Sequence, residues 1–117
     1  MFFDNHKVSC VAGNLRFLMN FLPKEKRPME VIQFQSGRLK GALKTVEKQL
    51  SDTKWLAASD DITIADIAVA GYLYYPEPFT FDRKEYPNIA RWLDAIAAQP
   101  GWKAPYDLMP GSPADRA

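Results

Sequence analysis

The 117-residue sequence has few of the residues that build disulfides and metal sites. Cys10 is the only cysteine and His6 the only histidine, which excludes an internal disulfide and argues against a zinc site of cysteines and histidines. Fifteen basic residues against 14 acidic ones leave a formal charge of +1, with no run of like charge long enough to follow a phosphate backbone. We therefore expect no metal ion and no nucleic-acid partner.

Long apolar runs and targeting signals are missing as well. The longest apolar stretch, residues 67–75, is far short of the roughly 20 residues of a membrane span, and the N-terminus lacks the basic-then-apolar order of a signal peptide. A glycine-rich phosphate loop, Cys-x-x-Cys and Gly-x-Ser-x-Gly are also absent. We expect a soluble, cytoplasmic protein that has no membrane partner.

The sequence does contain enough apolar material for a core. With 47% hydrophobic and 13% aromatic residues, residues 1–117 are predicted to form a single domain. Prolines divide the chain into four blocks of helical periodicity, and no segment alternates with period two for long enough to make a sheet. The prediction is an all-α helical bundle of about four main helices. An irregular tail over residues 103–117 follows, and Trp102, Tyr106 and Met109 are expected to anchor it.

The first predicted helix ends at Pro23. Its pattern is already present at Phe2 and Phe3, and no capping residue precedes them, so the chain is expected to begin partway into a helix. One face of this helix is apolar and the opposite face is polar or small. The apolar face holds Val11, Leu15, Leu18 and Leu22, and the opposite face holds Asn5, Ser9, Gly13, Arg16 and Asn20.

The second predicted helix begins at Pro28 and ends near Ser51. Gly37 and Gly41 lie inside it, and each costs about 1 kcal/mol relative to alanine. Either the backbone of a neighbouring segment comes close to these glycines, or they are ordinary weak points on an exposed stretch. The sequence favours neither explanation.

The third predicted helix has the strongest local signal. The Thr63 hydroxyl is placed to accept from the N–H of Asp66, the Asp66 carboxylate to accept from the N–H of Thr63, and Ile62 to pack on Ile67 as a hydrophobic staple. The following residues are apolar on nearly every side, which predicts a helix buried in the middle of the domain. We therefore interpret Asp66 as a cap rather than as a catalytic acid.

The fourth predicted helix begins at Tyr86-Pro87-Asn88 and ends at Gln99-Pro100-Gly101. Its apolar stripe consists of Ile89, Trp92, Leu93, Ile96 and Ala97.

Polar residues on the apolar side of the first helix are the candidate functional feature. Asp4, Lys7 and Asn14 lie within or beside the arc that holds the apolar residues. One explanation is an Asp4–Lys7 ion pair at a solvated helix end. The other is that Phe3, Lys7, Cys10 and Asn14 form one wall of a cleft or of a subunit contact, and spacing alone leaves both open.

His6 and Cys10 lie four residues apart, a spacing at which their side chains can meet and a cysteine could be activated as a nucleophile. The sequence provides no third residue to orient such a pair. The favoured interpretation is a packed cysteine beside a partly exposed histidine.

Four segments together resemble a known family. They are Trp55-Leu56-Ala57, Thr63-Ile64-Ala65-Asp66-Ile67, Tyr86-Pro87-Asn88-Ile89 with Trp92-Leu93, and Pro100-Gly101-Trp102. Over almost the whole chain the sequence resembles the C-terminal helical domain of cytosolic glutathione S-transferases. The Thr-Ile-Ala-Asp capping box is the most specific element of this resemblance.

The resemblance implies a division of labour between two domains. In that family an N-terminal thioredoxin-like domain binds glutathione and activates its thiol, and that domain is absent from this sequence. The full-length parent would conjugate glutathione, its co-substrate, to small hydrophobic electrophiles, while the helical half binds substrate and supports the dimer. The chain alone is therefore expected to contain no catalytic residue, to bind no cofactor and to be inactive.

The stretch Asp4-Asn5-His6-Lys7 is similar to an acidic-x-His-Lys stretch of the bacterial beta-type enzymes. By this similarity Asp4 would contact the amino group of glutathione held by the other subunit. Cys10 would not correspond to the beta-type catalytic cysteine, which belongs to the other domain. The substrate-cleft residues implied are Phe3, His6, Lys7, Cys10 and Asn14.

A helical half without its partner domain should expose an apolar surface. We therefore expect a homodimer or a higher oligomer, with Phe2, Phe3 and Val11 at the contact. Two alternatives remain: a non-catalytic interaction module like those of elongation factor 1 subunits and synthetase-associated scaffolds, in which the chain would be complete, and a stand-alone carrier of apolar ligands.

Overall fold

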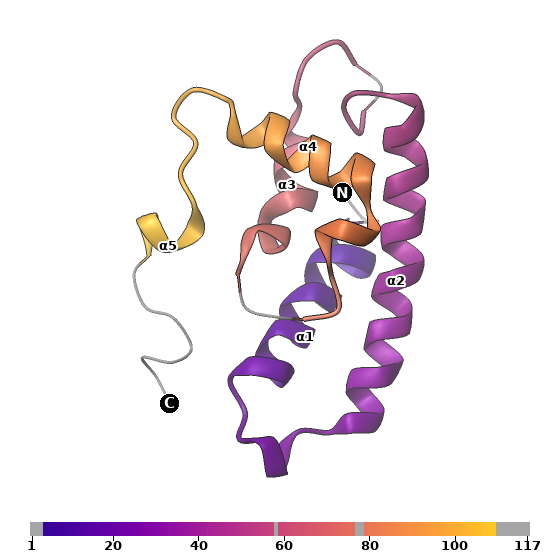
Figure 1. Ribbon diagram of the computed structural model, residues 1–117, viewed down its shortest axis with the longest axis vertical. Coiled ribbons are helices and arrows are strands. Elements are labelled where there is room, and N and C mark those ends of the chain that lie inside the picture. The colour runs from indigo at the N-terminus through magenta and orange to yellow at the C-terminus, as the bar shows by residue number, and fades with distance from the viewer. Residues whose placement is uncertain (1–3, 58, 77–78, 110–117) are drawn as a thin grey trace.

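The computed structural model describes residues 4–57, 59–76 and 79–109, with side chains from Lys7 onward. These residues form helices, turns and loops without a strand, which confirms the all-α prediction. Figure 1 shows the elements in order. The α-helices are α1 (Cys10–Asn20), α2 (Met29–Asp52), α3 (Ile64–Ala70), α4 (Pro87–Ala97) and α5 (Pro105–Leu108), and the π-helical and 3-10 turns are η1 (Asp4–Ser9), η2 (Lys24–Lys26), η3 (Gly71–Tyr74) and η4 (Arg83–Glu85).

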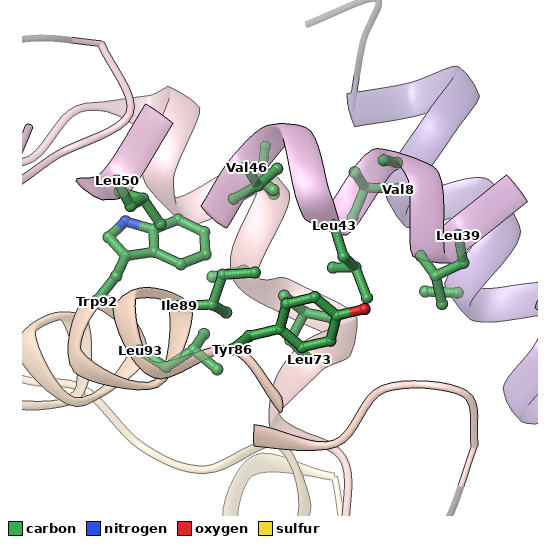
Figure 2. Close-up of a cluster of buried hydrophobic side chains, with 14 of the residues drawn as sticks. Val8, Leu39, Leu43, Val46, Leu50, Leu73, Tyr86, Ile89, Trp92 and Leu93 are labelled. Atoms are coloured by element: carbon green, nitrogen blue, oxygen red, sulfur yellow. The ribbon is translucent and has the colours of Figure 1, made fainter. Parts of the chain in front are cut away.

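The long helix α2 organises the packing. Helices α1 and α4 both pack against it, and α3 packs against η1 and α4. In Figure 1, α2 runs along one edge of the molecule and α4 crosses its C-terminal half. Figure 2 shows the centre of the core, where side chains of η1, α2, η3 and α4 meet. They include Val8, Leu39, Leu43, Val46, Leu50, Leu73, Ile89, Trp92 and Leu93, and they are joined by Tyr86, which directly precedes α4; all of these residues are buried.

Glu47 of α2 holds the start of α4. Its Oε1 accepts from the backbone N–H of Asn88 over 2.9 Å, and its Oε2 accepts from that of Ile89 over 2.8 Å. Arg91 makes the reverse connection, because its guanidinium donates to the carbonyl of Leu50 at the end of α2 over 3.0 Å. Each helix thus satisfies free backbone groups of the other, which fixes how α2 and α4 cross.

The helix bounds agree with the sequence prediction for α2 and α4 and differ in two other places. The first predicted helix ends earlier, at Asn20, and its expected start at Phe2 and Phe3 lies outside the described residues. The tail expected to be irregular contains the helix α5, which has Pro105 in its first turn. Proline suits that position, since its fixed φ matches a helix and no N–H is needed there.

Two expectations about burial are wrong. Val11, placed at a subunit contact, is 2% exposed because it faces the core. Met109, expected to anchor the tail, is exposed, whereas Trp102 does pack against the core. Its ring centroid lies 5.0 Å from that of Tyr74.

Candidate functional site

The Asp66 carboxylate positions the helix that carries the site. Asp66 is fully buried, and Oδ2 accepts from the backbone N–H of Thr63 over 3.0 Å, so the predicted capping box is present. The Thr63 hydroxyl also accepts from the N–H of Ala65, over 3.3 Å. Oδ1 accepts from the backbone N–H of Leu56 and from the indole N–H of Trp92, each over 2.8 Å. With both oxygens engaged, Asp66 is a structural cap and does not face a substrate.

The outer side of α3 is apolar and exposed. Ile64 is 74% exposed and Ile67 is 61% exposed, so the prediction that this helix is buried on nearly every side is wrong. Only the side that holds Val69, Ala70 and Asp66 faces the core. The packing of Ile62 on Ile67 stays a prediction.

A cavity of about 410 Å³ lies where η3 faces the C-terminal segment. It begins where α3 tightens into η3 at Gly71, and Tyr72, Tyr74 and Tyr75 line one side of it. The walls are aromatic and aliphatic except for Ser9, Lys103 and the tyrosine hydroxyls. The lining residues are Ser9, Ile67, Ala68, Gly71, Tyr72, Tyr74, Tyr75, Ile96, Trp102, Lys103, Pro105, Leu108 and Met109.

Arg16 of α1 ties α5 to the rest of the fold. Its guanidinium carbon lies 3.8 Å from the ring centroid of Tyr75 and 5.0 Å from that of Phe21. The same guanidinium donates to the hydroxyl of Tyr106 over 2.6 Å. Tyr106 also meets Tyr75 edge to face, with centroids 5.4 Å apart. Cation–π and hydrogen-bond contacts to one side chain therefore hold α5 at the mouth of the cavity.

The face of α1 that was predicted to lie opposite the core is packed as well. The Ser9 hydroxyl, at the end of η1 and directly before α1, donates to the carbonyl of Ala68 over 3.3 Å, which joins η1 to α3. A Cβ at Gly13 would lie 3.0 Å from Cζ of Tyr72, so the Tyr72 ring rests closely on α1 and any larger residue at position 13 would require the ring to shift by a few tenths of an ångström. Periodicity identified the main core face but could not show that a second layer covers the opposite face.

Three of the predicted cleft residues share one exposed strip of η1 and α1. Lys7, Cys10 and Asn14 are all exposed, and the Asn14 amide nitrogen lies 4.0 Å from the Cys10 sulfur. The interpretation of Cys10 as a packed residue is therefore wrong. Phe3 and the side chains of Asp4 and His6 lie outside the described residues, so the His6–Cys10 pairing stays a prediction.

The hydroxyl of Tyr74 is a donor and not a base. It donates to the carbonyl of Leu93 over 2.6 Å, and burial raises the pKa of Tyr74 to about 12, although the nearby Arg83 guanidinium acts in the opposite direction. At neutral pH the Tyr74 hydroxyl is therefore uncharged.

Sequence reasoning missed the cavity, although its signal was present. The run Tyr72-Leu73-Tyr74-Tyr75 before a proline is unusually aromatic for a helix end, but the cavity also needs α5, which was predicted to be irregular.

The described residues contain no group of histidine, cysteine or acidic side chains that could hold a metal ion. Among them there is also no helix that is both long and apolar enough to cross a membrane. The site can hold and orient an apolar molecule, and its described walls contain no activated nucleophile.

Comparison with known proteins gives consistent results. Residues 16–100 match the family model "Glutathione S-transferase, C-terminal domain". A solved glutathione S-transferase from Xanthobacter autotrophicus Py2 superposes with a TM-score of 0.81 at 27% identity, covering 92% of this chain and 53% of that one. One from Pseudomonas fluorescens has a TM-score of 0.73 at 33% identity, covering 85% and 49%.

A curated relative matches over a shorter stretch. Glutathione S-transferase D7 of Drosophila melanogaster is 38% identical over 47 residues, which are 39% of this chain and 21% of that protein. The chain thus spans about half the length of the solved structures it resembles, and the match covers about a fifth of this curated relative.

Proposed function

Because this chain belongs to the glutathione S-transferase C-terminal domain family, we propose that it is the substrate-binding helical half of a glutathione S-transferase and holds small hydrophobic electrophiles in the cavity beside η3. The observation that carries the proposal is the cavity itself. Its volume of about 410 Å³ suits a small organic molecule, and its walls are mostly aromatic and aliphatic. Burial of an apolar electrophile against these walls would supply binding energy without polar contacts.

The contribution of the helical half to conjugation would be positioning. Conjugation joins the glutathione sulfur to an electrophilic carbon, and holding the electrophile near the thiolate makes an otherwise bimolecular encounter effectively unimolecular. Tyr72 and Trp102 provide flat surfaces for an aromatic electrophile, and Arg16 keeps α5 in place across the cavity mouth. The thiolate would come from glutathione bound to a thioredoxin-like domain, against which the exposed Ile64 and Ile67 are proposed to pack.

The remaining assignments rest on the resemblance. Asp4 is proposed to contact the amino group of glutathione held by the other subunit of a homodimer. By the resemblance, His6, Lys7, Cys10 and Asn14 are proposed to face the substrate cleft. Lys7, Cys10 and Asn14 are exposed but are not among the residues that line the cavity beside η3, so they would belong to a part of the cleft outside that cavity. A cytoplasmic location is proposed with it.

A binding experiment tests the cavity. Gly71 lines it, and a Cβ at Gly71 would meet nothing within 4 Å among the described residues, so Gly71→Leu should fill the cavity and still fold. Titration with chlorodinitrobenzene should quench tryptophan fluorescence through Trp102. Gly71→Leu should weaken this binding about tenfold or more, since ligand and leucine compete for one space. The matched control Ala98→Leu, on an exposed residue at the end of α4, should bind like the wild type.

An activity measurement completes the test. The chain alone should neither conjugate glutathione to chlorodinitrobenzene above the uncatalysed rate nor bind immobilised glutathione. Conjugation by the chain alone would contradict the assignment of thiol activation to another domain. Equal ligand binding by wild type and Gly71→Leu would contradict the cavity as the substrate site.

A further inference from the structure

The cavity beside η3 has walls of one charge sign. Among its described lining residues, Lys103 is the one that carries a full charge, and no aspartate or glutamate takes part. Lys103 is exposed, so its ammonium lies where the cavity meets the solvent. The remaining lining residues are uncharged, and most of them are aromatic or aliphatic. A ligand with an apolar body and a negative group therefore matches these walls better than a neutral or a cationic one.

The hydroxyl groups of the cavity do not select the sign of a ligand's charge. The Tyr74 hydroxyl donates to the carbonyl of Leu93, and the Ser9 hydroxyl donates to the carbonyl of Ala68, so both donors are engaged. A tyrosine hydroxyl such as that of Tyr72 can either donate or accept, and it therefore suits an anion and a neutral acceptor alike. Any preference of the described walls for a charged ligand must come from the lysine.

The Lys103 ammonium is not neutralised by the fold. Among the described residues, it has no partner in an ion pair. Asp107 is the nearest acidic residue in the sequence, but it is exposed and does not line the cavity. Arg16 also lies near α5, yet it does not line the cavity, and its guanidinium contacts the Tyr75 ring and the Tyr106 hydroxyl. Lys103 is therefore the cation that can meet a bound anion.

We propose that Lys103 determines the specificity of the cavity and that the preferred ligands are small aromatic molecules that carry a carboxylate. This inference rests on the proposed function and names the class of electrophile that the site would take. The aromatic ring would lie against the apolar walls, and the carboxylate would stay at the mouth beside Lys103. A lysine stem can follow apolar surface while its ammonium remains in water, so the pair forms without full desolvation. Beside apolar walls its attraction exceeds that of the same pair in bulk water.

Two ligands that differ in charge and hardly in shape test this preference. Chloronitrobenzoate and its neutral amide, chloronitrobenzamide, share one nitroaromatic ring, and both should quench the fluorescence of Trp102 in the cavity wall. At neutral pH and low salt, the wild type should bind the benzoate at least as tightly as the amide. Raising sodium chloride to about 0.5 M should weaken binding of the benzoate and leave that of the amide nearly unchanged, because salt screens exposed charge pairs.

Variants of Lys103 separate its charge from its apolar stem. Lys103→Met keeps an unbranched stem and should weaken binding of the benzoate about three- to fivefold, while binding of the amide changes less than about twofold. Lys103→Glu should weaken binding of the benzoate about tenfold, and Lys103→Arg should keep the wild-type preference. Because Lys103 is exposed, these variants should fold. The matched control Lys40→Met, on an exposed residue of α2 that does not line the cavity, should bind both ligands like the wild type.

The cavity variant Gly71→Leu distinguishes failure of this inference from failure of the proposed function. If the cavity is the binding site, Gly71→Leu should weaken binding of the benzoate and of the amide alike. Equal effects of Lys103→Met on the two ligands, or Lys103→Met equal to Lys40→Met, would overturn the role of Lys103 and leave the cavity as the substrate site. Unchanged binding of both ligands to Gly71→Leu, or no binding of either ligand to the wild type, would overturn both proposals.

Discussion

The indole N–H of Trp92 in α4 donates to Oδ1 of Asp66 in α3 over 2.8 Å, and both residues are fully buried. The same oxygen accepts from the backbone N–H of Leu56, in the loop between α2 and α3. One carboxylate therefore joins the start of α3, the loop before it and the middle of α4. Asp66, which the sequence identifies only as a local helix cap, therefore also connects three segments of the tertiary structure.

Asp66→Ala should be among the most destabilising single changes in the described fold. It would leave the Trp92 indole and the backbone N–H groups of Leu56 and Thr63 without their acceptor. A loss of about 3 kcal/mol in the free energy of unfolding, or failure to fold, is expected because each orphaned buried donor costs about 1 to 3 kcal/mol. Urea denaturation measures it. Trp92→Phe is the comparison, because it removes one donor and leaves the capping box intact. It also removes indole volume, so part of its loss in stability would come from the cavity that remains. An unchanged urea midpoint for Asp66→Ala would contradict the proposed structural role of Asp66.

Glu47→Ala should loosen the contact between α2 and α4. The carboxylate accepts from the backbone N–H groups of Asn88 and Ile89 at the N-terminus of α4, where a negative charge also interacts favourably with the helix dipole. A loss of about 1 to 2 kcal/mol is expected. Glu25→Ala, on an exposed glutamate of η2, is the matched control and should change stability little. Equal midpoints in urea for the two variants would contradict the capping role.

Tyr74 should make the fold sensitive to alkaline pH. Its pKa is raised to about 12, chiefly by burial, from an ordinary value of 10.0, so the unfolded chain loses this proton more easily than the folded one. The stabilising effect is fully present below pH 10 and is lost as the pH rises through about 12. Thermal denaturation from pH 9 to 12 should therefore show a smaller decline for Tyr74→Phe than for the wild type. Some decline should persist in the variant, since burial also raises the pKa of Tyr86. Parallel curves for the two proteins would count against this assignment.

Arg16→Met should release α5 from the mouth of the cavity. The change keeps an unbranched apolar stem but removes the hydrogen bond to Tyr106 and the cation–π contact with Tyr75. Trypsin should then cleave after Lys103, just before α5, several-fold faster, because local opening exposes the chain. Arg38→Met on α2, far from α5 in sequence, serves as the control. Unchanged cleavage at Lys103 would show that other contacts hold α5.

Local sequence signals determined the elements that depend on neighbouring residues. Thr63 and Asp66 specify the start of α3 because capping acts within one helical turn, and the spacing of apolar residues together with Pro28 and Pro87 specifies α2 and α4. The family resemblance includes these local signals, which is why the family could be recognised without a structure; its model matches residues 16–100.

Other features were decided by contacts between segments distant in sequence. Tyr106 lies 90 residues from the Arg16 that holds it, and Trp92 lies 26 residues from Asp66, so no local pattern could pair them. The exposure of Ile64 and Ile67 and the burial of the polar side of α1 depend on which elements cover each face. Periodicity reports that a face is apolar or polar, but only the assembled fold determines what packs against it, because burial is a property of the surroundings and not of the residue.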